Sequence, residues 1–260
     1  MTVTPNRFPV DEPLTTLERW RYRAACAYVT SWQYRDFAKD DRTFLEVLMA
    51  NGVEIATVFD VGASNGAWGL MVPHFIPGIR SFMFEPLVGH SEGYSRFMRG
   101  LLSSHPDWTL FTCALSDKEG ETTIYMDKNV YGSTLIPGPY AEANWQKIDV
   151  EVRTIDGLVA SGDATQPDVI KIDTQGSELA ILKGGERVLA GTKALLLETW
   201  LTRGYGPRTP LLTELVPWLA ERNFVPVEFA DGYRSPDGLM RSVDAFFLRR
   251  DIAEKVKYAL

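Results

Sequence analysis

Cysteine and histidine are both scarce in this chain of 260 residues. The two cysteines, Cys26 and Cys113, fall in an apolar helix-like stretch and in a predicted strand, where a thiol packs as a small hydrophobic group. His74, His90 and His105 stand far apart, and no His-x-x-x-His or Cys-x-x-Cys pair has the spacing of zinc ligands. The sequence therefore predicts neither a disulfide framework nor a structural zinc site.

Basic charge and long apolar runs are lacking as well. The chain has 27 Lys and Arg residues against 34 Asp and Glu, so its net charge of −7 does not attract nucleic acid or anionic lipid. No window reaches the ~20 apolar residues that cross a bilayer. The first residues lack the basic start and apolar core of a signal peptide. We therefore expect a cytoplasmic protein without nucleic-acid or membrane partners.

What the sequence does contain is an alternation of strand-like and helical segments. Strands are expected at residues 57–61, 81–85, 109–115, 121–126, 168–172, 194–198, 225–229 and 245–248. Helices are expected at 178–189 and 211–222, and the strands at 109–115 and 121–126 are expected to pair as a hairpin. Such alternation predicts an α/β fold with a doubly wound, mostly parallel sheet.

Ahead of the first strand, apolar residues recur at helical spacing between positions 14 and 51. This pattern predicts two or three helices. We therefore expect residues 1–52 to form a helical N-terminal extension that helps to enclose the substrate, and residues 53–260 to form a single ligand-binding domain.

The strongest local signal is a glycine loop that follows the first strand. It reads Asp60, Val, Gly62, Ala63, Ser, Asn65, Gly66, and an apolar helix begins directly after it. A loop of this kind can offer backbone N–H groups and a helix N-terminus to a ligand. A nicotinamide fingerprint would have glycines at 62, 64 and 67, but this chain has Ser64 and Ala67, and Asp60 is an awkward neighbour for a pyrophosphate. The amino-acid group of S-adenosylmethionine, which carries both an ammonium and a carboxylate, suits this loop better.

Acidic and polar residues at the ends of the next two strands extend this predicted site. Glu85 ends the second strand 23 residues after Gly62, where its carboxylate can accept hydrogen bonds from both hydroxyls of an adenosine ribose. Ser116 and Asp117 follow the third strand and are expected near the adenine ring.

A second motif spans residues 169–185 and reads VIKIDTQGSELAILKGG. It resembles the FkbM-type methyltransferase family, whose fourth strand runs into an I-K-I-D-x-[EQ]-G-x-E pattern. The resemblance extends from about residue 57 to 249 and includes DVGASNG, FEP, ALSDKEG, LLLE and the closing VDAFFLRR.

This resemblance implies a class I methyltransferase fold, which is Rossmann-like, with seven strands of which the last is antiparallel. It also implies methyl transfer from S-adenosylmethionine to a hydroxyl of a small molecule. Asp60, Gly62, Asn65 and Gly66 would be cofactor-loop residues and Glu85 the ribose ligand. Asp173, Gln175 and Glu178 would form an acidic loop beside the methyl group.

The chemistry itself points to two carboxylates. Methyl transfer needs an oxygen held in line with the methyl carbon and a group that removes the hydroxyl proton. Asp173 follows the fourth strand and Glu198 ends the fifth, so both are candidates for the base, for a substrate anchor, or for ligands of a hard cation such as Mg²⁺. Lys171 is expected to pair with an acid.

Tyr131, Trp200 and Tyr205 follow strands on the expected ligand side and are candidates for substrate contacts. Two alternatives to a methyltransferase stay open: a catalytically silent adenosyl-binding or scaffold protein, and an NAD-dependent oxidoreductase, although no Tyr-x-x-x-Lys proton donor is present. The sequence also leaves the oligomeric state open, a homo-oligomer included.

Overall fold

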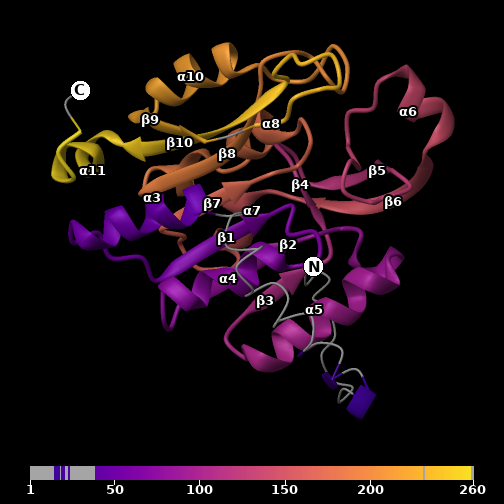
Figure 1. Cartoon of the computed structure of the whole chain (residues 1–260), viewed down its shortest axis with the longest axis horizontal. Coiled ribbons are helices and arrows are strands. Elements are labelled where there is room, and N and C mark those ends of the chain that lie inside the picture. The colour runs from indigo at the N-terminus through magenta and orange to yellow at the C-terminus, as the bar shows by residue number, and fades with distance from the viewer. Residues whose placement is uncertain (1–14, 18, 21–22, 24–38, 231, 259–260) are drawn as a thin grey trace.

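The fold is a seven-stranded sheet of order β3-β2-β1-β7-β8-β10-β9 (Figure 1). The computed structural model describes residues 15–17, 19–20, 23, 39–230 and 232–258. The strands of this sheet are β1 (Thr57–Val61), β2 (Arg80–Phe84), β3 (Thr109–Phe111), β7 (Val169–Ile172), β8 (Ala194–Trp200), β9 (Phe224–Ala230) and β10 (Ser242–Arg249). Neighbours from β3 to β8 run parallel, and β10 runs antiparallel to both β8 and β9. The predicted seven-stranded, mostly parallel sheet with an antiparallel last strand is confirmed.

Helices cover both faces of the sheet because its strands alternate apolar side chains to either side. One face packs against α3 (Lys39–Ala50), α4 (Ala67–Phe75), α5 (Glu92–Ser104) and α11 (Arg250–Lys255). The other packs against α7 (Ile155–Ala160), α8 (Glu178–Lys183), α9 (Glu186–Leu189) and α10 (Leu212–Ala220). In β1, Val58 belongs to the first core and Phe59 to the second, so Asp60 faces the α3 and α4 side.

In the N-terminal region that was expected to be helical, α3 is the longest described segment, and residues 16–17, 19–20 and 23 are helical as well. Phe44, Leu45 and Leu48 are fully buried, and the Phe44 ring stacks on Phe246 of β10 with ring centroids 4.8 Å apart. This segment therefore packs directly on the sheet. Most of the other predicted helical positions before residue 39 lie outside the described residues, and so does Cys26, while Cys113 is buried as expected.

The predicted hairpin between residues 109–115 and 121–126 is wrong. The first segment divides into β3, which ends at Phe111, and β4 (Ala114–Leu115), which leaves the main sheet. Both β4 and β5 (Gly120–Met126) pair with β6 (Gln146–Arg153), which sequence reasoning missed, and not with each other. The turn at 117–120 therefore joins opposite edges of a second, three-stranded sheet with its own small core of Ile124, Ile148 and Val150.

This second sheet and the short η1 (Val88–His90) and α6 (Pro139–Asn144) complete the described elements. Figure 1 shows α6 and β5 at one end of the central sheet. The predicted helix 178–189 divides into α8 and α9, which Gly184 and Gly185 separate, and a Cβ at Gly184 would lie 2.0 Å from the carbonyl oxygen of Ser116. No helix in the described part of the chain is long and apolar enough to cross a membrane.

Candidate active site

A cavity of about 560 Å³ lies beyond the carboxyl ends of β1, β2, β7 and β8. Strand order reverses between β1 and β7, so this is the crevice in which open α/β sheets bind ligands. Eight of the residues singled out from the sequence line it: Gly62, Ala63, Asn65, Glu85, Tyr131, Asp173, Gln175 and Glu198. The fold therefore brings most of the predicted site residues into one cavity.

The glycine loop after β1 uses most of its backbone N–H groups in hydrogen bonds within the protein. Gly62 has a φ of 76°, and a Cβ at this position would lie 2.0 Å from the carbonyl oxygen of Asp173. The close approach that requires glycine here is thus to the neighbouring loop. The N–H groups of Gly62 and Ala63 donate to the carbonyl of Phe84, and that of Gly66 donates to the carbonyl of Ala63. Most of the N–H groups that the sequence predicted for a ligand are already used.

Glu85 follows directly after β2, lines the cavity and contacts this loop. Its Oε2 accepts a hydrogen bond from the Ser64 N–H at 2.8 Å, and its Oε1 accepts one from the Leu87 N–H at 2.9 Å. Burial raises the pKa of this carboxyl to about 7, although both N–H groups oppose the rise. Ser64 also donates its hydroxyl to Tyr94, so the loop, β2 and α5 are tied together around Glu85.

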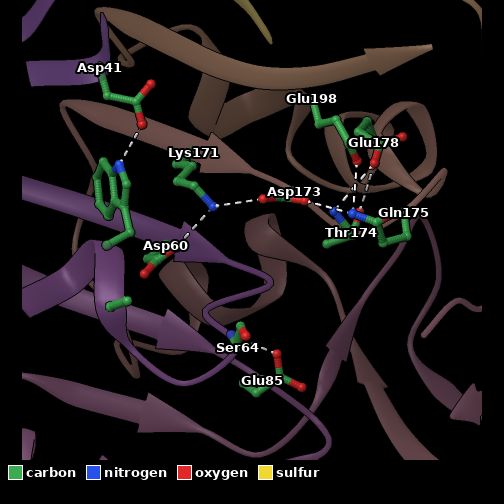
Figure 2. Close-up of polar contacts among 12 residues, drawn as sticks. Asp41, Asp60, Ser64, Glu85, Lys171, Asp173, Thr174, Gln175, Glu178 and Glu198 are labelled. Carbon is green, nitrogen blue, oxygen red and sulfur yellow. Dashed lines mark hydrogen bonds and ion pairs between the residues drawn. The ribbon is translucent and has the colours of Figure 1, made fainter. Parts of the chain in front are cut away.

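On the other side of the loop, Lys171 of β7 lies between two carboxylates (Figure 2). Its Nζ is 3.7 Å from Oδ1 of Asp60 and 3.5 Å from Oδ2 of Asp173. Asp60 and Lys171 are directly opposite in the β1 and β7 register, so both side chains lie on the α3 and α4 face of the sheet. Asp60 is fully buried and does not line the cavity, and neither of its carboxylate oxygens has a hydrogen-bond partner among the described residues.

Gln175 joins the two predicted catalytic carboxylates. Its Nε2 donates to Asp173 Oδ1 and to Glu198 Oε2, both at 3.0 Å, and Figure 2 shows its amide between them. The Tyr205 hydroxyl donates to the Gln175 Oε1, which fixes the amide with its nitrogen toward the carboxylates. Gln175 has a φ of 59°, and its carbonyl accepts a hydrogen bond from the buried Thr134 hydroxyl at 2.8 Å.

Glu198 sits in a strongly acidic part of the cavity. It faces Asp244 directly across the β8 and β10 pairing, and both side chains line the cavity. Burial, followed by the negative charge of Asp173, raises the pKa of Glu198 well above its ordinary value. The same two causes raise the pKa of Asp244 to about 7, and burial raises that of Asp60 to about 6.

Several predicted site residues lie elsewhere. Gly66 packs against Met98 and Leu101, so its missing side chain makes room for α5. Ser116 and Asp117 line a second cavity, on the far side of Leu135 and Ser177. Trp200 is buried and does not line the first cavity, and its ring meets Tyr205 edge to face at 5.0 Å. That these residues contact a ligand remains a prediction. In this structure Gly66 and Trp200 contribute to packing.

Glu178 does not line the cavity either. Its Oε1 accepts the N–H of Gly176 at 2.9 Å and that of Thr174 at 3.3 Å, which shapes the loop carrying Asp173 and Gln175. Burial raises the pKa of this carboxyl to about 7.

Sequence reasoning missed two charged residues that line the cavity, Asp41 and Asp244, and it expected Lys171, which lines the cavity too, only to pair with an acid. Asp41 of α3 accepts a hydrogen bond from the indole N–H of Trp68 at 2.7 Å. Lys171 and Asp244 are charged residues within otherwise buried strands. A charge at such a position is rare in a core, and this was the sequence signal that could have identified them as site residues. For Asp41 no comparable signal exists, because only packing of α3 brings it to the cavity.

Among the described residues, no group of three or more His, Cys, Asp or Glu side chains is arranged to hold a metal ion. Asp173 and Glu198 are bridged by an amide, which cannot share a cation with them through its nitrogen. The expectation that these two carboxylates bind Mg²⁺ therefore gains no support from the donor set.

Comparison with known proteins gives a family match over residues 60–226, to the family described as "Methyltransferase FkbM domain". A hexuronic acid methyltransferase of Haloferax volcanii is 26% identical over 195 residues, which cover 70% of this chain and 72% of that protein. Methyltransferase sdnD of Sordaria araneosa is 26% identical over 185 residues, which cover 60% of this chain and 71% of that protein.

Among solved structures, an FkbM methyltransferase from Methylobacillus flagellatus matches at 19% identity with a TM-score of 0.47. That match covers 74% of this chain and 43% of the other, so it spans less than half of that protein's length. A magnesium protoporphyrin IX methyltransferase from Synechocystis with bound S-adenosylmethionine matches at 10% identity and a TM-score of 0.46, over 92% of this chain and 88% of the other.

Proposed function

This chain belongs to the FkbM methyltransferase family and is an S-adenosylmethionine-dependent methyltransferase, and from this we infer that its cavity methylates a hydroxyl oxygen of a small molecule such as a sugar or a secondary metabolite. Family membership decides against the nicotinamide-dependent oxidoreductase that the sequence left open. The observation that carries the proposal is the pairing of Asp173 and Glu198 through Gln175 in the same cavity as Glu85.

The residues of the cavity fit the cofactor. Glu85 faces the cavity at the end of β2, where a carboxylate can accept hydrogen bonds from ribose hydroxyls, and Cys113, Ala114 and Leu115 offer an apolar surface for an adenine ring. The volume of about 560 Å³ is in the range of cofactor sites. The amino-acid group would then extend over the crevice between β1 and β7, toward Asp173.

The cofactor supplies an electrophilic methyl group on a sulfonium, which leaves without help from a protein acid. The protein must therefore position an acceptor hydroxyl and take its proton as the new bond forms. Glu198 is suited to take the proton, because a carboxylate with a raised pKa is a stronger base near neutral pH. Asp173, whose side chain is 43% exposed toward the cavity, is suited to accept a hydrogen bond from the acceptor and hold it.

Gln175 keeps these two carboxylates apart and in place. Without the amide between them, the carboxylates of Asp173 and Glu198 would repel each other and compete for one proton. The amide donates to both, and Tyr205 holds the amide in turn. Tyr205 thus acts on the site through Gln175, while Tyr131 lines the cavity and stays a candidate for acceptor contacts.

The acceptor class is supported by one relative, the hexuronic acid methyltransferase of Haloferax volcanii, whose acceptor is a sugar acid. Transfer to oxygen rests on the paired carboxylates described above. The experiment is to incubate the purified protein with methyl-labelled S-adenosylmethionine and a panel of hexoses, hexuronic acids and hydroxylated polycyclic metabolites. We expect a labelled methyl ether, which survives alkali. A label that alkali releases as methanol would instead show esterification of a carboxylate, and labelling of amines would contradict transfer to oxygen.

The raised pKa values predict that the stability of the ligand-free protein falls as the pH rises, whereas its affinity for the cofactor product increases. Asp60, Glu85, Glu178 and Asp244 have pKa values of about 6 or 7 in the folded chain, above those of unfolded carboxyls. Their contribution to the free energy of unfolding is therefore complete below pH ~4 and is lost as the pH rises through 6 to 7. Thermal melts of the ligand-free protein should show this loss of stability between pH 5 and 8.

Affinity for S-adenosylhomocysteine should rise over the same interval, because the ionised Glu85 is the better acceptor for ribose hydroxyls. Each pH unit below the pKa lowers the ionised fraction about tenfold, so calorimetry should find affinity about tenfold lower at pH 6 than at pH 8. In Glu85→Gln the tenfold difference between pH 6 and pH 8 should shrink, because the part of the pH dependence that comes from Glu85 is removed. A flat affinity profile in the wild-type protein would contradict the role given to Glu85.

A further inference from the structure

The cofactor's amino-acid group carries a carboxylate, and the cavity offers few partners for it. The acidic side chains that line the cavity are those of Asp41, Glu85, Asp173, Glu198 and Asp244. Among the described residues lining it, Lys171 is the one basic side chain. A carboxylate entering this cavity away from Lys171 would meet like charge, which disfavours binding.

Backbone donors of the glycine loop do not solve this problem. Besides Gly62, Ala63 and Gly66, the N–H of Ser64 donates to Glu85 and the N–H of Ala67 donates to the Asn65 side chain. Five of the six residues from 62 to 67 therefore donate their N–H groups to acceptors within the protein. A loop with so few free N–H groups binds a carboxylate poorly, so a side-chain cation is the better partner for it.

Lys171 has a free bonding capacity that points to a further partner. Its contacts with Asp60 and Asp173 are 3.7 and 3.5 Å long, whereas charge-assisted N–H to O contacts are ordinarily about 2.7–2.9 Å. An ammonium has three donors, so neither contact saturates it. Burial alone would lower the pKa of Lys171, but the carboxylates of Asp173 and Asp60, with Asp41 and Asp244 beyond them, outweigh burial and keep the group charged.

The location of Lys171 also agrees with the placement of the cofactor. It lies on β7 beside β1, at the point where strand order reverses, while Glu85 lies on β2 beyond the glycine loop. Figure 2 shows Lys171 and Asp173 on one side of Ser64 and Glu85 on the other. A cofactor whose ribose meets Glu85 therefore extends its amino-acid end toward Lys171, over the loop.

We propose that Lys171 binds the carboxylate of the cofactor's amino-acid group, and that the buried Asp60 is the counter-charge that holds Lys171 in place. The inference rests on the cofactor placement given under the proposed function, but not on the identity of the methyl acceptor. It reassigns Asp60 from a direct cofactor contact to a partner of Lys171, in agreement with its complete burial.

The test is a calorimetric comparison of two ligands: S-adenosylhomocysteine and its analogue in which hydrogen replaces the carboxylate. Lys171→Met keeps the length of the side chain and removes the charge. We expect it to lower affinity for S-adenosylhomocysteine at least tenfold and to leave affinity for the decarboxylated analogue undiminished. Lys171→Arg, which keeps a cation, should retain affinity for S-adenosylhomocysteine to within about threefold.

Lys193→Met is a matched control, because Lys193 pairs with Asp168 at 2.8 Å outside the cavity. It should alter thermal stability without changing either affinity. The proposal is overturned if Lys171→Met binds S-adenosylhomocysteine like the wild type, or if it loses both ligands equally. Should Lys171→Met fail to fold, the wild-type protein decides: it must bind the analogue at least tenfold more weakly than S-adenosylhomocysteine. An absent acceptor activity would leave these affinities unaffected and would count against the proposed function alone.

Discussion

Replacing Glu198 by Gln is expected to lower the turnover number by about a hundredfold or more, which is the scale of general-base catalysis. The amide has the shape of the carboxylate, and its oxygen can still accept from Gln175. It cannot take a proton from the acceptor. Affinity for S-adenosylhomocysteine should stay within a few-fold of the wild type, because the carboxylate acts on the acceptor and not on the cofactor. Steady-state kinetics on the acceptor found by the labelling screen, with calorimetry alongside, measure both quantities.

Glu186→Gln provides the matched control for this variant. Glu186 forms a surface ion pair with Arg222 at 2.9 Å and does not line the cavity, so the same chemical change should leave turnover unaltered. Exposed pairs of this kind contribute little to stability. If Glu198→Gln retained more than a tenth of wild-type turnover, Glu198 would not be the base, and Asp173 would become the candidate to test in the same way.

Replacing Gly62 by Ala is expected to lower the free energy of unfolding by ~4 kcal/mol and to abolish binding of S-adenosylhomocysteine. Two costs combine here. The left-handed φ of 76° disfavours a side chain, and the new Cβ would lie 2.0 Å from the carbonyl oxygen of Asp173 and 2.9 Å from its carbonyl carbon. Because these are backbone atoms, relief requires the glycine loop and the loop carrying Asp173 to move apart. Chemical denaturation and calorimetry would show the two effects.

Gly78→Ala separates the two costs. Gly78 has nearly the same φ, 78°, but a Cβ there meets no heavy atom within 4 Å. This variant carries the conformational penalty alone, about 1 to 2 kcal/mol, and should bind S-adenosylhomocysteine normally. Equal destabilisation in Gly62→Ala and Gly78→Ala would show that the contact between the two loops is loose, and that the glycine is there for its backbone conformation only.

Gly62→Ala probes the direct contact between the loop after β1 and the loop after β7. The chain uses Gly62 to bring these loops together, Lys171 and Asp60 to pair across the same two strands, and Gln175 to extend the contact to Glu198. The glycine loop after β1 and the loop after β7 that carries Asp173 and Gln175 are therefore in direct contact. A substitution in either loop should therefore change both the affinity for the cofactor and the turnover number.

The central sheet was predictable because each of its strands carries its own local signal. Short, mainly apolar runs such as 57–61 and 194–198 give this signal, and the structure has strands there. The second sheet was not predictable to the same degree. β6 alternates buried Ile148, Val150 and Val152 with polar residues, but whether β5 pairs with it or with the preceding strand is a long-range choice that no local pattern encodes.

By itself, the sequence determined the sheet, the family and the chain segments that carry Glu85, Asp173, Gln175 and Glu198, because strand-end motifs are local and the carboxyl ends of parallel strands meet at one edge. Only the tertiary structure decided which neighbours those residues have. Asp60 is buried beside Lys171 and does not line the cavity, Ser116 and Asp117 line a second cavity, and α3 brings Asp41 to the first. Side-chain direction and long-range packing depend on strand register and helix docking, and these are fixed by the whole core rather than by any one segment.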